Sequence, residues 1–152
     1  MFIRHSGGEN RVSGIFWMSP SQQELYQRFS NIVLNDNTCK TNKFNMYLSV
    51  FMVKNNYGRF RNVANALVED KLSSTYVWIL KCLAKVTDNK IPKSLWTDSE
   101  PGLINAIFQV FPNTQHFLCL FHIWQNIIKH LRGSLGSNFN DFGTIPVAFN
   151  KH

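Results

Sequence analysis

Two aspartates are the residues of this chain whose types and spacing best fit a chemical role. The sequence holds only nine Asp and Glu, and Asp36 and Asp98 each follow a short apolar run, at residues 32–34 and 94–97. If these runs are neighbouring strands of one sheet, the two carboxylates lie about 5 Å apart. They then repel by roughly 3 kcal/mol at an effective dielectric constant of about 20. Such a pair shares a proton or binds a cation.

Carboxylate oxygens are ligands that suit Mg²⁺ or Mn²⁺. Two such ions, about 3.5–4 Å apart, activate a water or hydroxyl and stabilise the leaving oxygen of a phosphodiester, as in nucleases and strand-transfer enzymes. Each acid also has a simpler interpretation by itself. Asp36 could open an Asx turn, and Asp98 could cap a helix that begins near Glu100. From the residues alone, the paired-metal interpretation and the two structural ones stay open.

The hydrophobic periodicity predicts the elements that must position these acids. Strands are expected at residues 14–18, 32–36, 47–53, 59–68, 94–98 and 115–120. Helices are expected at 21–30, 72–83, 99–111 and 120–131, the last of them ending at Gly133. Either Ser19 before Pro20, or a capping box of Ser21 and Glu24, would begin the first helix. A three-strand meander followed by βα units predicts a mixed sheet with helices on both faces.

Composition narrows the class of protein. The 152 residues are 44% hydrophobic and carry 16 Lys and Arg against nine acids, for a formal net charge of +7. Such an excess attracts polyanions and favours a nucleic-acid partner. No apolar run approaches the roughly 18 residues of a membrane span, and the first residues show no secretory signal. Three widely spaced cysteines, at positions 39, 82 and 119, are no disulfide framework and indicate a reducing compartment.

Three sequence blocks resemble those of Mutator-like element (MULE) transposases. The first is Asp36-Asn-Thr-Cys-Lys-Thr-Asn42, the second is Thr97-Asp98-Ser-Glu-Pro-Gly-Leu103, and the third contains the Cys-x-x-His pair Cys119 and His122. The resemblance runs from about Gly14 to Leu131, and far-red-response regulator proteins of plants share the same blocks. It implies a DDE-type catalytic core on an RNase H-like fold, an α/β class in which a mixed sheet of three antiparallel meander strands plus parallel strands is flanked by helices.

The resemblance also implies a site. Asp36 and Asp98 would be the first two catalytic, metal-binding acids, with Mg²⁺ or Mn²⁺ as cofactor in an intact enzyme that cuts and joins DNA. The third acid of the family is a Glu far downstream, whereas only Glu100 and Asp141 follow Asp98 here. We therefore expect a C-terminally truncated core that is inactive by itself. Residues 1–13 would be an N-terminal segment, 14–132 the partial core, and 133–152 an irregular tail where a missing insertion begins.

The remaining predictions concern partners and smaller sites. The expected partner is DNA, in the nucleus, with oligomerisation compatible and no membrane contact. Lys40 and Lys43 are candidate DNA contacts beside the first acid, and Arg59 and Arg61 are further basic residues of the meander. One alternative function is a domesticated DNA-binding or transcription-regulating module without catalysis. A second alternative is a different RNase H-like nuclease, with Glu69 as its third carboxylate.

The pair Cys119 and His122 would serve a structural role or position a DNA end. With His116 nearby it lacks a convincing fourth ligand, so zinc is not expected. The helical spacing groups His122 with Gln125, Asn126 and Lys129 on a polar, accessible face.

Overall fold

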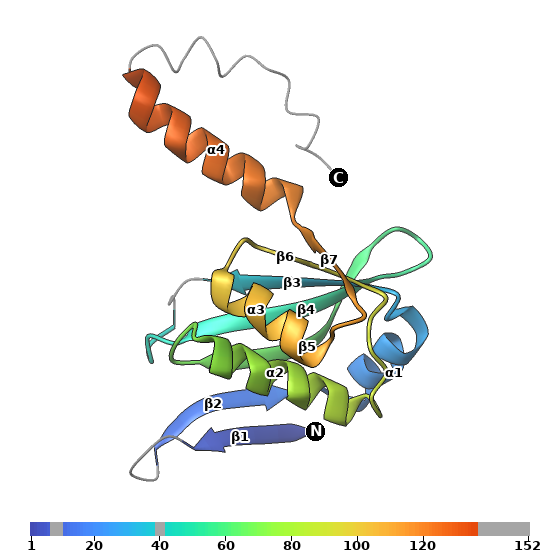
Figure 1. Ribbon diagram of the computed structural model, residues 1–152. Coiled ribbons are helices and arrows are strands. Elements are labelled where there is room, and N and C mark those ends of the chain that lie inside the picture. The colour runs from blue at the N-terminus through green and yellow to red at the C-terminus, as the bar shows by residue number, and fades with distance from the viewer. Residues whose placement is uncertain (7–10, 39–41, 137–152) are drawn as a thin grey trace.

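The computed structural model describes residues 1–6, 11–38 and 42–136, and these form one seven-stranded sheet with four helices (Figure 1). The strands run in the spatial order β1-β2-β5-β4-β3-β6-β7. In chain order the elements are β1 (Phe2–Ser6), β2 (Val12–Trp17), α1 (Pro20–Phe29), β3 (Ile32–Thr38), β4 (Tyr47–Lys54), β5 (Phe60–Val68), α2 (Ser73–Val86), β6 (Ser94–Thr97), α3 (Pro101–Val110), β7 (Gln115–Leu118) and α4 (Leu120–Leu135). None of the helices in these ranges is long and apolar enough to cross a membrane.

The sheet has the expected mixed topology. Strands β3, β4 and β5 pair antiparallel as a meander, whereas β6 pairs parallel with β3 and β7 pairs parallel with β6. The helices α2 and α3 form the two crossovers. This is the predicted RNase H-like α/β arrangement, with the first meander strand in mid-sheet. The hairpin of β1 and β2 extends it beyond β5. No strand was predicted within residues 1–13, because β1 has no clear apolar alternation and depends on its pairing with β2.

Local capping chemistry explains the start of α1, and two helix boundaries differ from the sequence predictions. Ser19 caps α1, because its Oγ accepts a hydrogen bond from the backbone N of Gln22 while its own N donates to Gln22 Oε1. The predicted box of Ser21 and Glu24 is therefore wrong, since the helix begins at Pro20. The predicted stop at Gly133 is also wrong, because α4 continues to Leu135.

One buried core joins the sheet to three helices. The residues that contribute to it from strands alternate with less buried neighbours, and Tyr26 of α1, Leu80 of α2 and Ile107 of α3 complete the same cluster. We call this side of the sheet the covered face. Within the described residues, the opposite side, which we call the open face, is approached by Gln22 of α1, whose Nε2 donates to Oδ1 of Asn62, and by the first turn of α4, which then projects away from the sheet (Figure 1).

The open face carries apolar side chains that do not belong to the buried core. A cavity of about 370 Å³ lies there, lined by Ile32, Leu34, Lys54, Phe60, Trp96, Cys119, Leu120 and Phe121. None of the described side chains of α4 is buried, whereas each of the other three helices has at least one buried residue. Within the described residues, the expectation of helices on both faces thus holds on the open face only for one side chain of α1, Gln22, and for the first turn of α4.

Candidate active site

The ends of β3 and β6 bring the two predicted acids to one edge of the sheet. In the parallel register, Ile32 pairs with Ser94 and Leu34 with Trp96, the last matched pair. Asp36 and Asp98 each stand two residues beyond that pair. Parallel strands end on the same side of a sheet, so both acids lie at that side, each the same number of residues beyond the last pair. The Asx-turn interpretation of Asp36 is wrong, because β3 continues through it to Thr38.

Asp36 meets the first turn of α4. Nε2 of His122 lies 3.3 Å from Oδ1 of Asp36, and both side chains are partly exposed. His122 was predicted on a polar, accessible face, but its Nδ1 is buried and has no hydrogen-bond partner within the part of the chain that the structure describes. The Cys-x-x-His histidine is therefore a direct neighbour of the first predicted acid, which the sequence spacing could not show.

Asp98 is oriented by contacts of its own. Its Oδ2 accepts a hydrogen bond of 3.4 Å from Nδ2 of Asn37, and its Oδ1 accepts one of 3.4 Å from the backbone N of Glu100. The Oγ1 of Thr97 donates to the backbone oxygen of Asp98 at 2.8 Å. Glu100 is the N-cap residue of α3 and has no side-chain capping bond. The capping alternative for Asp98 is therefore wrong, because its carboxylate bonds to the N-cap residue and not to the first turn of α3.

Buried polar residues stand behind Asp98, and the sequence analysis did not single them out. Nδ2 of Asn35 donates to Oγ of Ser49 at 2.8 Å and to the backbone oxygen of Val50 at 3.2 Å. Nδ2 of Asn37 donates to Oδ1 of Asn35 at 3.2 Å. Their signal in the sequence is two Asn at alternate positions around Asp36, since residues i and i+2 of a strand face the same side.

Thr97 connects this edge to β7. Its Oγ1 lies 2.8 Å from Nε2 of His116. Because the hydroxyl hydrogen goes to the Asp98 carbonyl, His116 is assigned as the donor to Thr97. Burial lowers the pKa of His116 below its ordinary value of 6.5, which favours the neutral ring.

The predicted Cys119 lies at the N-cap of α4. Its backbone N donates to the Thr97 oxygen at 2.7 Å, and its side chain lines the open-face cavity. Within residues 1–6, 11–38 and 42–136, no three His, Cys, Asp or Glu gather into a group that could hold a metal ion. The three residues of the considered zinc set therefore do not meet there.

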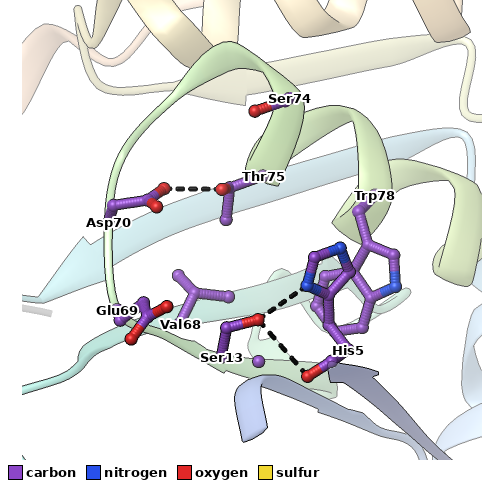
Figure 2. Close-up of a pocket in the computed structure, with 9 residues that line it drawn as sticks. His5, Ser13, Val68, Glu69, Asp70, Ser74, Thr75 and Trp78 are labelled. Carbon is purple, nitrogen blue, oxygen red and sulfur yellow. Dashed lines mark hydrogen bonds between the residues drawn. The ribbon is translucent and has the colours of Figure 1, made fainter. Parts of the chain in front are cut away.

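Glu69 does not belong to this edge, so the three-acid nuclease that depended on it is wrong. Oε2 of Glu69 pairs with Nη2 of Arg11 at 2.5 Å. Figure 2 shows Glu69 in a separate pocket, of about 220 Å³, with His5, Ser13 and Trp78. There Oγ of Ser13 lies 2.7 Å from Nδ1 of His5.

The basic candidates divide between the two ends of the meander. Lys43 is exposed in the connection after β3, with its Nζ 4.9 Å from the centre of the Phe44 ring. Lys40 lies outside the described residues. Arg59 and Arg61 are exposed and lie toward the opposite end of the meander. Their position follows from the register, since Arg61 pairs with Val53 whereas Asp36 pairs with Val50. Lys43 is therefore the described basic candidate in the connection that follows β3, the strand that carries Asp36.

Comparisons with known proteins point the same way as the sequence blocks. The model of a family described as MULE transposase domain matches residues 32–126. The chain is 27% identical over 122 residues to Protein FAR-RED IMPAIRED RESPONSE 1 of Arabidopsis thaliana, which covers 80% of this chain and 15% of that protein. It is 25% identical over 137 residues to Putative protein FAR1-RELATED SEQUENCE 10 of the same plant, covering 90% of this chain and 20% of that one. The chain thus spans a fifth or less of the length of these relatives.

Among solved structures, one match is the HTLV-2 integrase catalytic core domain in complex with magnesium, in its trimeric form. The two chains are 20% identical, with a TM-score of 0.44 over 77% of this chain and 76% of that chain.

Proposed function

This chain belongs to the MULE transposase domain family, and we propose that its β3–β6 edge is the divalent-metal edge of a DNA-processing core. Asp36 and Asp98 are the proposed metal ligands. The observation that carries the proposal is their equal overhang beyond the last parallel pair, Leu34 and Trp96. DNA is the proposed partner, which fits the net charge of +7 and makes the nucleus the proposed compartment.

The residues at this edge fit Mg²⁺ or Mn²⁺ by their chemistry. Both acids offer carboxylate oxygens and neither is buried, and Mg²⁺ is commonly bound by one or two carboxylates while it keeps several waters. When bound, the ion would neutralise and polarise a phosphate group of the DNA. The chain's own residues hold and orient: Asn37 and the Glu100 backbone steady Asp98.

Cleavage requires more than binding. In the described residues no third carboxylate joins Asp36 and Asp98 as a ligand group. We therefore propose that this 152-residue chain binds Mn²⁺ and DNA but cuts DNA weakly or not at all. If the chain nicks a supercoiled plasmid robustly in Mn²⁺ and Asp98→Asn abolishes the nicking, the proposal that the chain is inactive is wrong. The same result would support the proposed metal site.

The site is tested by Mn²⁺ binding, followed by electron paramagnetic resonance of the free ion. Asp36→Asn and Asp98→Asn should each raise the dissociation constant at least about tenfold, since a ligand charge is lost. Asp88→Asn is the matched control, because Asp88 is exposed after α2 and its left-handed backbone suits Asn. Equal constants for Asp36→Asn, Asp98→Asn and Asp88→Asn would disprove the metal edge.

A second candidate is a DNA-binding module without catalysis, and the contact between His122 and Asp36 favours it. The imidazole of His122 already contacts one oxygen of Asp36, so it would compete with a metal ion for that carboxylate. DNA affinity should then fall steeply with salt, because phosphate contacts release counterions. Mg²⁺ should change the affinity only through its contribution to ionic strength. Affinity that stays flat from about 50 to 200 mM salt would exclude phosphate contacts for both candidates.

A further inference from the structure

A line of hydrogen-bonded amides leads from the interior of the sheet to Asp98. It begins at Ser49 on β4, passes through Asn35 and Asn37 on β3, and ends at Oδ2 of Asp98. Asn35 is 1% exposed and Ser49 is 2% exposed. Buried polar groups without partners destabilise a fold, so the inner half of this line is held to one arrangement.

The bonding pattern determines which way each amide points. A side-chain amide has two N–H donors and one oxygen. Both donors of Asn35 are used, by Ser49 and by the Val50 carbonyl, which leaves its oxygen facing Asn37. Both donors of Asn37 are used in turn, by the Asn35 oxygen and by Asp98. A reversed Asn37 would set its oxygen against the Asn35 oxygen and the Asp98 carboxylate, so it is excluded.

We propose that Asn37 is a positioning residue for the metal edge, where it holds the Asp98 carboxylate ready beside Asp36. This inference rests on the proposed function. Asn37 follows Asp36 in the chain, and its side chain binds Asp98 across the strand pair. Asn37 and the Glu100 backbone each contact one oxygen of Asp98. A carboxylate has about four acceptor positions, so the carboxylate is oriented while positions remain for a metal ion.

Core packing alone does not account for these residues. Asn is disfavoured inside strands relative to β-branched residues, and the neighbouring covered-face position, Val33, is apolar. The amides Asn62 and Asn65 on β5 offer a contrast, because they are hydrogen-bonded to each other and not to an acid. Of the two Asn on β3, Asn37 is the one that reaches the charged group at the sheet edge.

The test compares Mn²⁺ binding by the full chain with that of Asn37→Leu. Loss of an outer-sphere partner of a metal ligand typically weakens metal affinity about 10–100-fold, so we expect at least a tenfold higher dissociation constant. Asn65→Leu is the control, with the same substitution on another strand and an expected change below about twofold. Circular dichroism and melting check that each variant folds, and Asn37→Ala replaces Asn37→Leu if the larger side chain prevents folding.

The outcomes separate this inference from the function beneath it. A tenfold loss in Asn37→Leu with an unchanged control supports the positioning role. If Asp98→Asn weakens Mn²⁺ binding but the folded Asn37 variant binds as tightly as the wild type, the positioning role is overturned and the metal edge is kept. Wild-type binding no tighter than that of Asp98→Asn overturns both.

Discussion

The two faces of the sheet differ although the same strands build them. On β3, Val33 is buried while its neighbour Ile32 is exposed, and both are β-branched apolar residues. Within the described residues, helices α1, α2 and α3 contribute to the core on the covered face, whereas the open face meets only Gln22 of α1 and the first turn of α4. Burial therefore reflects which elements pack on a face, and not the hydrophobicity of its residues.

The candidate site lies where the two faces meet. Hydrogen bonds from inside the sheet reach Asp98. Asn37, itself bonded to Asn35, donates to its carboxylate, and Thr97, which lies against His116, donates to its backbone oxygen. Asp36 instead contacts His122 at the start of the projecting helix. The comparison teaches that one acid is steadied by the ordered core, while the other faces the side of the sheet that remains accessible to a ligand.

The largest expected difference is in the free energy of unfolding when one Phe is removed from each face. Phe51→Ala on β4, where the side chain is 0% exposed, should lower it by about 3–5 kcal/mol through lost burial and a cavity. Phe60→Ala on β5, 53% exposed beside the open-face cavity, should lower it by less than about 1 kcal/mol. Urea unfolding of both variants measures this, and equal losses would break the comparison.

A matched pair of isoleucines extends the comparison of the two faces to the helices. Ile107→Ala in α3, at a residue that is 1% exposed, should lower the free energy of unfolding by about 2–4 kcal/mol. Ile127→Ala in α4, at 43% exposure, should change it by about 0.5 kcal/mol or less. Thermal melting provides the measurement. A large loss for Ile127→Ala would mean that α4 is packed in solution.

Thiol chemistry distinguishes the faces next. Burial raises the pKa of Cys82 on α2 to about 11, opposed only in part by Lys85, so little of the reactive thiolate is present at neutral pH. Cys119 is half-buried and lines the open-face cavity. Alkylation followed by site-resolved mass spectrometry should show Cys119 modified at least about tenfold faster than Cys82. Faster modification of Cys82 would contradict the core placement of α2.

The smallest effect is a pH dependence on the Thr97–His116 side of the site. Because the folded-state pKa of His116 lies below 6.5, the unfolded chain binds its proton at higher pH than the folded chain does. Its contribution to stability is therefore complete above about pH 6.5 and is lost as the pH falls from there toward the folded-state pKa. His116→Gln should flatten the melting temperature between about pH 6.5 and 5. An unchanged slope would show that the imidazole is solvated in the fold.

Much of the architecture was predictable because its signals are local. The meander and the two βα units follow from periodicity, and Ser19 with Pro20 marks the start of α1. The β1 strand was missed because its order depends on pairing with β2. The true end of α4 was missed because one glycine disfavours a helix by only about 1 kcal/mol, which neighbouring residues can offset.

The sequence by itself determined the fold class, the order of the meander and βα strands, and the placement of Asp36 and Asp98 on or just after neighbouring strands, because hydrophobic period and short sequence blocks act over a few residues. Only the tertiary structure decided which side chains meet those acids: His122 at Asp36, and Asn37 at Asp98. These contacts join residues more than 60 positions apart. Such distant pairs are set by strand register and chain crossing, which no local pattern encodes.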